Sequence, residues 1–234
     1  MRIVLKPAGA AALIMAFVSL AALIVWRSSQ NKRADALAEA PAHTATGTPM
    51  PPYPSTIQAP TSENELQNRR FEEGYGPVRW YDNKATLTGT IANHWYDDSS
   101  WAKVTVDYAW ERREQHTGAV SQKITIHKME STPTAPAAVQ FVQPVRLTAG
   151  KKYTAGFWLR ADRTTKIEVL LRQAPTPYTP YCSTLATIGT TWQHVLTSGT
   201  AGLDPNTYLM LRITTPGTVW IDDAALVLQS GHTP

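Results

Sequence analysis

The sequence lacks a second cysteine. Cys182 is the only one among 234 residues, so no intrachain disulfide can form. A fold without disulfides must rest on its hydrophobic core, sometimes supplemented by a bound metal ion. At this length the chain can hold one domain of ordinary size and a smaller segment. Cys182 belongs to no recognisable catalytic motif, and we interpret it as structural or incidental.

The sequence also lacks the common catalytic motifs. It has no G-x-S-x-G, no H-E-x-x-H, no glycine-rich phosphate loop and no paired cysteines for zinc. A glycosidase needs two carboxylates across a cleft, whereas most acidic residues here fall at turns or at solvated strand positions. Examples are Asp97, Asp98, Asp107, Glu168 and Asp222. We therefore expect a protein that is not an enzyme. A polysaccharide lyase using Tyr178, Arg172 or His194 is the less favoured alternative.

A continuous basic stripe is absent as well. The formal net charge is +4 and the sequence pI is about 9.2, but basic residues are scattered among acidic ones. Arg112 and Arg113, for example, lie between Glu111 and Glu114. This pattern disfavours nucleic-acid binding.

Phenylalanine is scarce relative to the other aromatic residues. The chain has four Phe against eight Trp and nine Tyr. Trp and Tyr combine apolar area with a polar edge, so this balance favours contact with a ligand over a role in the core alone.

An uncharged apolar run extends from Ala8 to Trp26 and is followed by Arg27. A run of about 18 or more apolar residues predicts a membrane-spanning helix, and we assign residues 1–27 as a signal anchor. The alternative is a cleaved signal peptide, for which residues 36–38 (Ala-Leu-Ala) offer small side chains but lie far beyond the run. We expect the rest of the chain to be extracytoplasmic, in the periplasm or at the cell surface.

A segment rich in Ala, Pro and Thr follows at residues 28–62 and includes the run Pro49–Pro54. Such a composition buries too little apolar surface to offset its ordering entropy. It predicts a disordered, semi-rigid linker.

From residue 63 the pattern changes to short alternating runs of β-branched and aromatic residues, punctuated by turn residues. The runs are Val104–Trp110, Lys123–His127, Tyr153–Arg160, Ile167–Arg172, Leu209–Ile213 and Thr218–Leu228. No persuasive helical period occurs. We predict an all-β, two-sheet sandwich over residues 63–229 and a tail at 230–234.

The alternation makes a further prediction about Trp158 and Arg172. If Phe157 and Leu171 face the core, Trp158 and Arg172 point away from it, on what we take to be neighbouring strands. We predict that they floor a ligand groove. The alternative is a Trp covered by a loop with an Arg stacked on it.

Gln173, Tyr178 and Tyr181 follow Arg172 closely and would extend this groove. A sugar ring has an apolar patch of C–H groups and a rim of hydroxyls. Aromatic planes suit the patch, whereas Gln and Arg suit the hydroxyls. These residue types favour a glycan ligand.

Four segments resemble the jelly-roll carbohydrate-binding modules of families 4, 9 and 22. Residues 68–74 are similar to the N-x-x-F-E-x-G opening, and residues 143–153 to Q-x-V-x-L-x-x-G-x-x-Y. The third and fourth segments are Thr191-Trp192-Gln193 and the closing motif at residues 217–224, and all four occur in the order found in these families. The resemblance implies a jelly roll that binds glycan chains, without catalysis, on a concave sheet face.

The resemblance also implies a structural calcium ion, with Glu72 and Asp223 as ligands. The alternative is that both residues make local hydrogen bonds at turns. Gln143 occupies a position where the family often has a polar groove residue. In the loop Asn93–Trp101, Trp95 or Trp101 would stack on a pyranose ring, unless both close the end of the sandwich as hydrophobic plugs.

Together these observations predict a membrane-tethered, non-catalytic carbohydrate-binding module for oligo- or polysaccharide. The alternative is an interaction protein of an exopolysaccharide or secretion assembly, in which the jelly roll binds a protein partner.

Overall fold

The computed structural model describes residues 66–79 and 84–229. The predicted anchor at 1–27, the linker at 28–62 and the tail at 230–234 lie outside these residues. Within the described ranges, no helix is long and apolar enough to cross a membrane.

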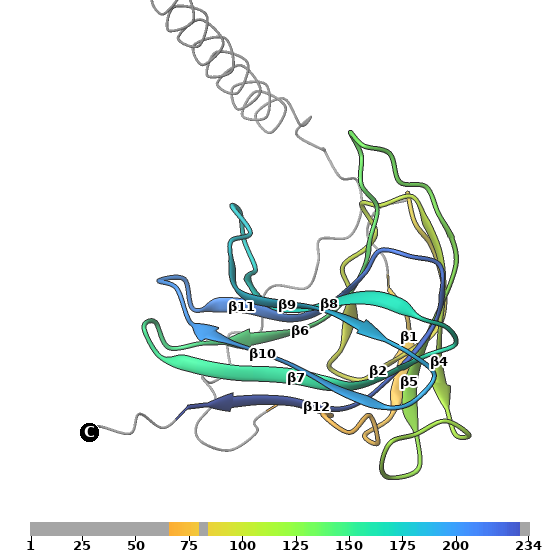
Figure 1. Ribbon diagram of the computed structural model, residues 1–234, viewed down its shortest axis with the longest axis horizontal. Helices are drawn as coiled ribbons and strands as arrows, with labels where there is room; N and C mark the ends of the chain where they lie inside the picture. The colour runs from red at the N-terminus through yellow and green to blue at the C-terminus, as the bar shows by residue number, and fades with distance from the viewer. Residues whose placement is uncertain (1–65, 80–83, 230–234) are drawn as a thin grey trace, which may run out of the picture. The chain divides into compact units, whose positions relative to one another are not determined.

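The described chain forms strands connected by loops and turns (Figure 1). The strands are β1 (Tyr75–Pro77), β2 (Thr86–Ala92), β3 (Tyr96–Asp97), β4 (Val104–Glu111), β5 (Ser121–Met129), β6 (Val139–Arg146), β7 (Lys152–Ala161), β8 (Thr165–Gln173), β9 (Pro180–Ile188), β10 (Gln193–Thr200), β11 (Asn206–Ile213) and β12 (Gly217–Leu228).

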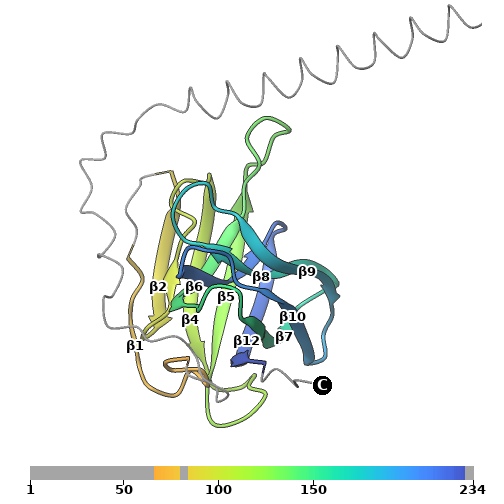
Figure 2. The same cartoon turned by 90° about the vertical axis from the view of Figure 1, so that its left-hand side faces the viewer.

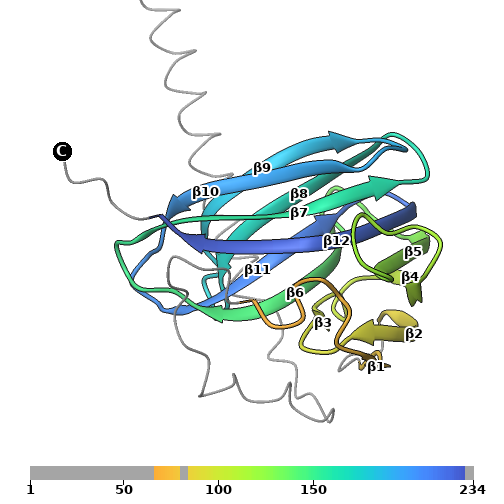
Figure 3. The ribbon, with the colours of Figure 1, turned by 90° about the horizontal axis from the view of Figure 1, so that it is seen from below.

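Two sheets contain all of these strands. One is seven-stranded with the order β1-β2-β4-β5-β12-β7-β10, and the other is five-stranded with the order β3-β6-β11-β8-β9. Figure 1 shows β6, β8, β9 and β11 above β7 and β12, and Figure 3 shows the same layers from below. Figure 2 shows β1, β2, β4 and β5 side by side. The prediction of an all-β, two-sheet sandwich is confirmed.

The alternation of the strands explains the core. On β7, Phe157 and Leu159 are fully buried, and on β11 Leu209 and Leu211 are fully buried. These side chains fill the space between the sheets, as a sandwich requires. The chain thus stabilises its fold by hydrophobic burial, and its one cysteine is unpaired.

Trp95 closes one end of this core. Its side chain is 1% exposed, and its ring stacks on Phe141 with centroids 4.8 Å apart. Phe71, which is fully buried, lies 5.3 Å away on the opening segment. The indole Nε1 donates to the backbone oxygen of Asn68 at 3.2 Å. Trp95 therefore holds the opening segment against the sandwich.

A buried carboxyl group joins the two sheets. Asp97 on β3 accepts hydrogen bonds from the Ser99 N–H and Ser99 hydroxyl, both at 2.7 Å, and from the Tyr108 hydroxyl on β4. β3 belongs to the five-stranded sheet and β4 to the seven-stranded sheet. Burial raises the pKa of Asp97, and the hydrogen bonds from Tyr108 and Ser99 oppose that rise.

The core role of Trp95 is testable by truncation. We expect Trp95→Ala to lower the free energy of unfolding by about 3–5 kcal/mol because it leaves a large cavity. Trp101→Ala, at a side chain that is 42% exposed, should lower it by less than about 1 kcal/mol. Urea denaturation measures both. Equal losses in the two variants would contradict the core assignment of Trp95.

Candidate functional site

The outer face of the five-stranded sheet carries an apolar row. Tyr96, Val142, Met210 and Leu170 are cross-strand partners on β3, β6, β11 and β8. Val142, Met210 and Leu170 are buried, and Tyr208 packs with them. This second cluster lies outside the main core because the strands alternate their side chains between the two faces.

An ion pair crosses this row. Arg172 on β8 donates from Nη2 to Asp98 Oδ2 at 3.0 Å, and Asp98 directly follows β3. Since β11 and β6 lie between β8 and β3, the pair must pass over both strands. The Arg172 side chain is 13% exposed and that of Asp98 26%. The ion pair is therefore partly shielded from water, which strengthens it relative to a surface pair.

Aromatic rings flank the Arg172 guanidinium. Its Cζ lies 4.8 Å from the Tyr178 ring and 5.6 Å from the Tyr208 ring, both within cation–π range. Tyr178 sits in the β8–β9 loop at φ 61°, a left-handed conformation uncommon for a residue other than glycine. Its side chain is 51% exposed. Trp101, 42% exposed, donates from Nε1 to the Asp98 backbone oxygen at 2.8 Å.

Two polar groups complete the arrangement. In the orientation that gives the Gln140 side-chain amide suitable hydrogen-bond partners, its nitrogen donates to Asp98 Oδ2 at 3.0 Å. The Arg172 Nε is buried and has no hydrogen-bond partner among the described residues. Burial raises the pKa of Asp98 to about 6, against the opposing effect of the Arg172 charge.

We call this set the Arg172 face. It consists of Asp98, Trp101, Gln140, Arg172 and Tyr178. It combines exposed aromatic rings with a carboxyl group, an amide and a guanidinium whose positions are held by hydrogen bonds. Such a surface suits a ligand that has both apolar patches and hydroxyl groups.

The predicted pairing of Trp158 with Arg172 on neighbouring strands is wrong. Trp158 lies on β7 in the seven-stranded sheet, whereas Arg172 lies on β8 in the five-stranded sheet. Both side chains point away from the core, as the alternation predicts. They do so on opposite faces of the sandwich, so they cannot floor one groove.

Trp158 is also covered on both sides. Its ring stacks on His194 with centroids 4.9 Å apart and on His116 with centroids 3.8 Å apart. His194 comes from β10, on one side of β7, whereas His116 is bonded to Asp223 on β12, on the other side. The alternative expectation, that Trp158 is covered rather than open to a ligand, therefore applies. The rings that stack on it belong to histidines and not to the arginine that this alternative expected.

Gln173 and Tyr181 do not join the Arg172 face either. Gln173 Nε2 donates to Asp204 Oδ2 at 3.3 Å, and the Tyr181 hydroxyl donates to the Asp204 backbone oxygen at 2.8 Å. Tyr181 also packs against Gly202, where an added Cβ would lie 2.5 Å from its ring. Both side chains thus brace the loop between β10 and β11.

Gln143 and Trp95 serve the fold rather than a groove. Gln143 is 4% exposed and points inward from β6. Its amide accepts from the Gln67 N–H at 3.0 Å and donates to the Gln67 backbone oxygen at 2.8 Å. Trp95 is the core plug described above. Of the two alternatives for the loop tryptophans, the plug applies to Trp95, whereas Trp101 remains exposed.

Glu72, one predicted calcium ligand, is already engaged by backbone donors. Its Oε1 accepts from the N–H groups of Ala119 at 2.7 Å and Val120 at 3.1 Å. The close approach depends on Gly118, which has φ +72° and whose added Cβ would lie 2.1 Å from Oε1. These bonds attach the opening segment to the β4–β5 loop.

Asp223, the other predicted ligand, also faces donors. It accepts from the Thr117 hydroxyl at 2.8 Å and His116 Nδ1 at 2.6 Å, and it pairs with Arg70 at 3.5 Å. In the described ranges no group of three or more His, Cys, Asp or Glu could hold a metal ion. Both carboxylates therefore make the local hydrogen bonds that the alternative expected. Calcium binding stays a prediction from the resemblance.

Sequence reasoning missed two members of the Arg172 face. Gln140 alternates with the buried Phe141, so its outward direction was readable from the sequence. Asp98 carried no such signal, because it follows a short strand and its partner Arg172 is 74 residues away. Only the strand order brings these residues together.

The comparisons with known proteins point to one fold. No protein-family model and no curated protein matches the sequence. A solved family 4 carbohydrate-binding module has a TM-score of 0.51 at 22% identity, covering 70% of this chain and 99% of that one. The CBM22-1 xylan-binding domain of Paenibacillus barcinonensis Xyn10C has a TM-score of 0.51 at 11% identity, covering 74% and 99%.

A putative sugar-binding protein from Bacteroides thetaiotaomicron has a TM-score of 0.50 at 15% identity, covering 71% of this chain and all (100%) of that one. At such low identities the likeness concerns the fold. It confirms the predicted jelly roll and the resemblance to modules of this kind.

The raised pKa of Asp98 predicts a pH-dependent contribution to stability. Because the folded state binds this proton more tightly than the unfolded state, the contribution is present below the unfolded pKa of about 3.9 and is lost as the pH rises through about 6. The stability difference between the native protein and Asp98→Asn should therefore fall by on the order of 2 kcal/mol from pH 4 to 7.

Urea denaturation across this pH range measures the difference. Asp162→Asn is the control of opposite sign, because a hydrogen bond from Arg163 holds the pKa of Asp162 below its usual value. Its contribution is present above the unfolded pKa and is lost on acidification. A parallel pH dependence for Asp98→Asn and the native protein would exclude the assigned titration.

Proposed function

We propose that the described domain is a non-catalytic carbohydrate-binding module that binds oligo- or polysaccharide chains at the Arg172 face. One observation carries this proposal. The buried Arg172 Nε has no hydrogen-bond partner among the described residues, while the same guanidinium lies against the exposed ring of Tyr178 and donates from Nη2 to Asp98. An unsatisfied buried donor is costly, so a ligand oxygen that reaches it when the exposed Tyr178 ring shifts would be bound favourably.

The rest of the face fits the same ligand. The exposed rings of Tyr178 and Trp101 offer apolar planes for the C–H patches of sugar rings. Asp98 and Gln140 offer an acceptor and an amide for paired bonds to hydroxyl groups. The affinity would be modest, because displaced water and ordering of the glycan offset much of each contact.

Two further features support binding without catalysis. Asp98 is paired with Arg172, and Glu168, on the same face, is paired with Arg212 at 2.6 Å. Neither carboxylate is thus set up as a free acid or nucleophile of a glycosidase. By analogy, the fold that this domain shares with a xylan-binding domain also supports glycan binding.

Substitution of the flanking residues tests the Arg172 face. We expect Tyr178→Ala and Arg172→Ala each to weaken glycan binding by about 10-fold or more, corresponding to about 1–3 kcal/mol for an aromatic or arginine anchor. Isothermal titration calorimetry of the full-length protein with neutral and acidic oligosaccharides measures this. A glycan microarray first identifies which of them bind.

Arg160→Ala is the matched control. Arg160 is also a strand arginine with a carboxylate partner, Glu114, and an aromatic neighbour, Trp220 at 5.2 Å, but it lies on the seven-stranded sheet. Its removal should leave glycan affinity unchanged. Full affinity in both Tyr178→Ala and Arg172→Ala would defeat the assignment. Failure to bind any glycan would favour the alternative of a protein-binding scaffold, and shortening of the ligand would indicate an enzyme.

The proposal includes membrane tethering through residues 1–27, with the domain on the extracytoplasmic side. It rests on the uncharged run from Ala8 to Trp26. We expect the full-length protein to sediment with membranes and to resist alkaline extraction. Protease added to the extracytoplasmic side should digest or release the domain. Recovery of the full-length protein from the soluble cytosolic fraction would exclude this arrangement.

A further inference from the structure

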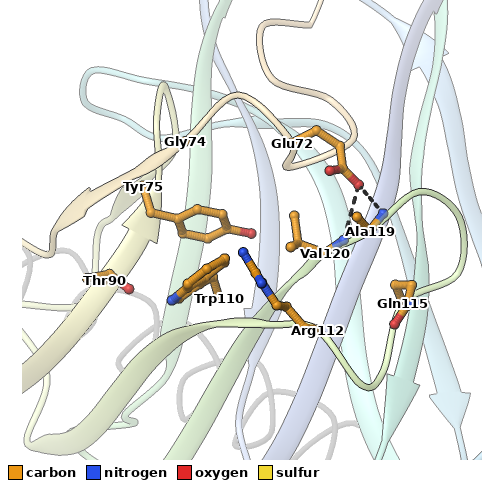
Figure 4. A pocket seen from close by; sticks show the side chains of 9 residues that line it. All are labelled: Glu72, Gly74, Tyr75, Thr90, Trp110, Arg112, Gln115, Ala119 and Val120. Atoms are coloured by element: carbon orange, nitrogen blue, oxygen red, sulfur yellow. Dashed lines mark hydrogen bonds between the residues drawn. The ribbon is translucent and has the colours of Figure 1, made fainter.

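A pocket lies on the seven-stranded sheet, away from the Arg172 face. It has a volume of about 860 Å³, and its lining includes Glu72, Tyr75, Thr90, Trp110 and Arg112 (Figure 4). These residues come from the opening segment, β1, β2, β4 and the β4–β5 loop. All of these strands belong to the seven-stranded sheet. We call this site the Trp110 pocket.

The floor of the Trp110 pocket is aromatic. Trp110 continues the alternation that buries Val106 and Tyr108 on β4, but its side chain is 47% exposed. The Tyr75 ring lies beside it, with centroids 6.1 Å apart. The Tyr75 hydroxyl donates to the Ser121 backbone oxygen at 3.1 Å, so this ring is held in place. An exposed indole thus lines a pocket whose neighbouring wall is rigid.

A cation with no carboxylate partner lies against this indole. The Arg112 Cζ is 4.3 Å from the Trp110 ring, and no carboxylate of residues 66–79 or 84–229 lies within ion-pair distance of it. The adjacent Glu111 is already engaged, because it accepts from two backbone N–H groups and pairs with Lys123 at 3.6 Å. The Arg112 donors therefore remain available to a ligand.

Glu72 provides an acceptor on the other side of the pocket. Its Oε1 accepts from the N–H groups of Ala119 and Val120, which fixes the carboxylate (Figure 4). No described group donates to the second oxygen, Oε2. The pocket thus presents a fixed acceptor, a cation and an aromatic plane, and its volume lies within the usual range for small-molecule sites, about 300–1,000 Å³.

From this geometry we infer that the Trp110 pocket is a second sugar-binding site, independent of the Arg172 face. A sugar ring lies with its C–H patch on Trp110. One of its hydroxyl groups donates a hydrogen bond to Glu72 Oε2, and another of its oxygens accepts one from the Arg112 guanidinium. The shared chemistry is a polyhydroxylated ring, of either a neutral sugar or a uronic acid. Two sites on different sheets would let one domain hold two chains, or two points of one chain.

The test uses the full-length protein with three probes: neutral xylo-oligosaccharides, neutral β-1,4-galacto-oligosaccharides and acidic oligogalacturonides. We expect Trp110→Ala to weaken binding of at least one probe by about 10-fold or to remove one binding site from the calorimetric stoichiometry. Glu72→Gln retains an acceptor for the two N–H groups, so it should keep the fold and weaken the same probe several-fold. Trp220→Ala is the control, because Trp220 also stacks with an arginine, Arg160, outside both sites.

This experiment can refute each of the two proposed sites independently of the other. Loss of binding in Arg172→Ala together with full affinity and stoichiometry in Trp110→Ala would overturn the Trp110 pocket alone. Loss confined to Trp110→Ala would support the pocket and overturn the Arg172 face. A native protein that binds none of the probes would overturn both. Arg112→Ala distinguishes the ligands, because it should abolish binding of an acidic probe but only weaken that of a neutral one.

Discussion

The arrangement of the Arg172 face depends on the buried carboxyl group of Asp97. Its oxygens accept from the Ser99 N–H, the Ser99 hydroxyl and the Tyr108 hydroxyl, and the last of these belongs to the opposite sheet. A buried carboxyl group without partners would cost several kcal/mol, so the folded state is restricted to geometries that keep these bonds. The two sheets are thereby fixed relative to each other at the end of the sandwich where β3 begins.

The hydrogen bonds of Asp97 also fix the neighbouring surface residues, because Asp98 and Ser99 directly follow it in the chain. The Ser99 hydroxyl that donates to Asp97 also accepts from the Gln140 N–H at 2.7 Å, and the Asp98 N–H donates to the Gln140 backbone oxygen at 2.8 Å. Asp98 is therefore positioned by the same network, and Trp101 is positioned by its bond to Asp98. A surface supported in this way keeps its geometry without a ligand, which lowers the entropic cost of binding.

Alternation made the direction of individual side chains predictable, but it carried no information about strand order. Phe157 and Leu171 face the core, and Trp158 and Arg172 face outward, as expected. β7 and β8 are consecutive in the chain, yet they belong to different sheets, so their outward residues lie on opposite faces. Sheet membership depends on pairings between distant segments, such as β7 with β12, and a local pattern contains no trace of them.

Burial of loop residues was equally unpredictable. Trp95 and Trp101 lie six positions apart in one loop-like stretch, and no local feature separates them. Trp95 is buried because Phe71 and Phe141, which are remote in sequence, converge on its ring. The opening and closing motifs were recognisable, and Arg70 of the first pairs with Asp223 of the second. The hydrogen-bond donors to Glu72 and Asp223, however, include residues of the β4–β5 loop, which belongs to neither motif.

Exposure, rather than residue type, separates the aromatic residues that cover the sandwich from those suited to a ligand. Trp158 lies between two histidine rings, and Trp220 lies against Arg160 and Lys123. These rings are occupied by the protein itself. Among the described residues, the large aromatic side chains that remain exposed are Trp101, Trp110 and Tyr178.

Leaving such rings in water forgoes apolar burial worth about 25 cal/mol per Å². All three lie beside a guanidinium or an aspartate: Trp110 beside Arg112, Tyr178 beside Arg172, and Trp101 beside Asp98. Each site also has a polar group that is held in place, namely Glu72 in the Trp110 pocket and the Arg172–Asp98 ion pair on the Arg172 face. A fold without disulfides depends on burial more than most, so it would be expected to cover these rings unless another molecule does. The coincidence of exposed aromatic planes with fixed polar groups at two separate places therefore favours binding surfaces over incidental exposure.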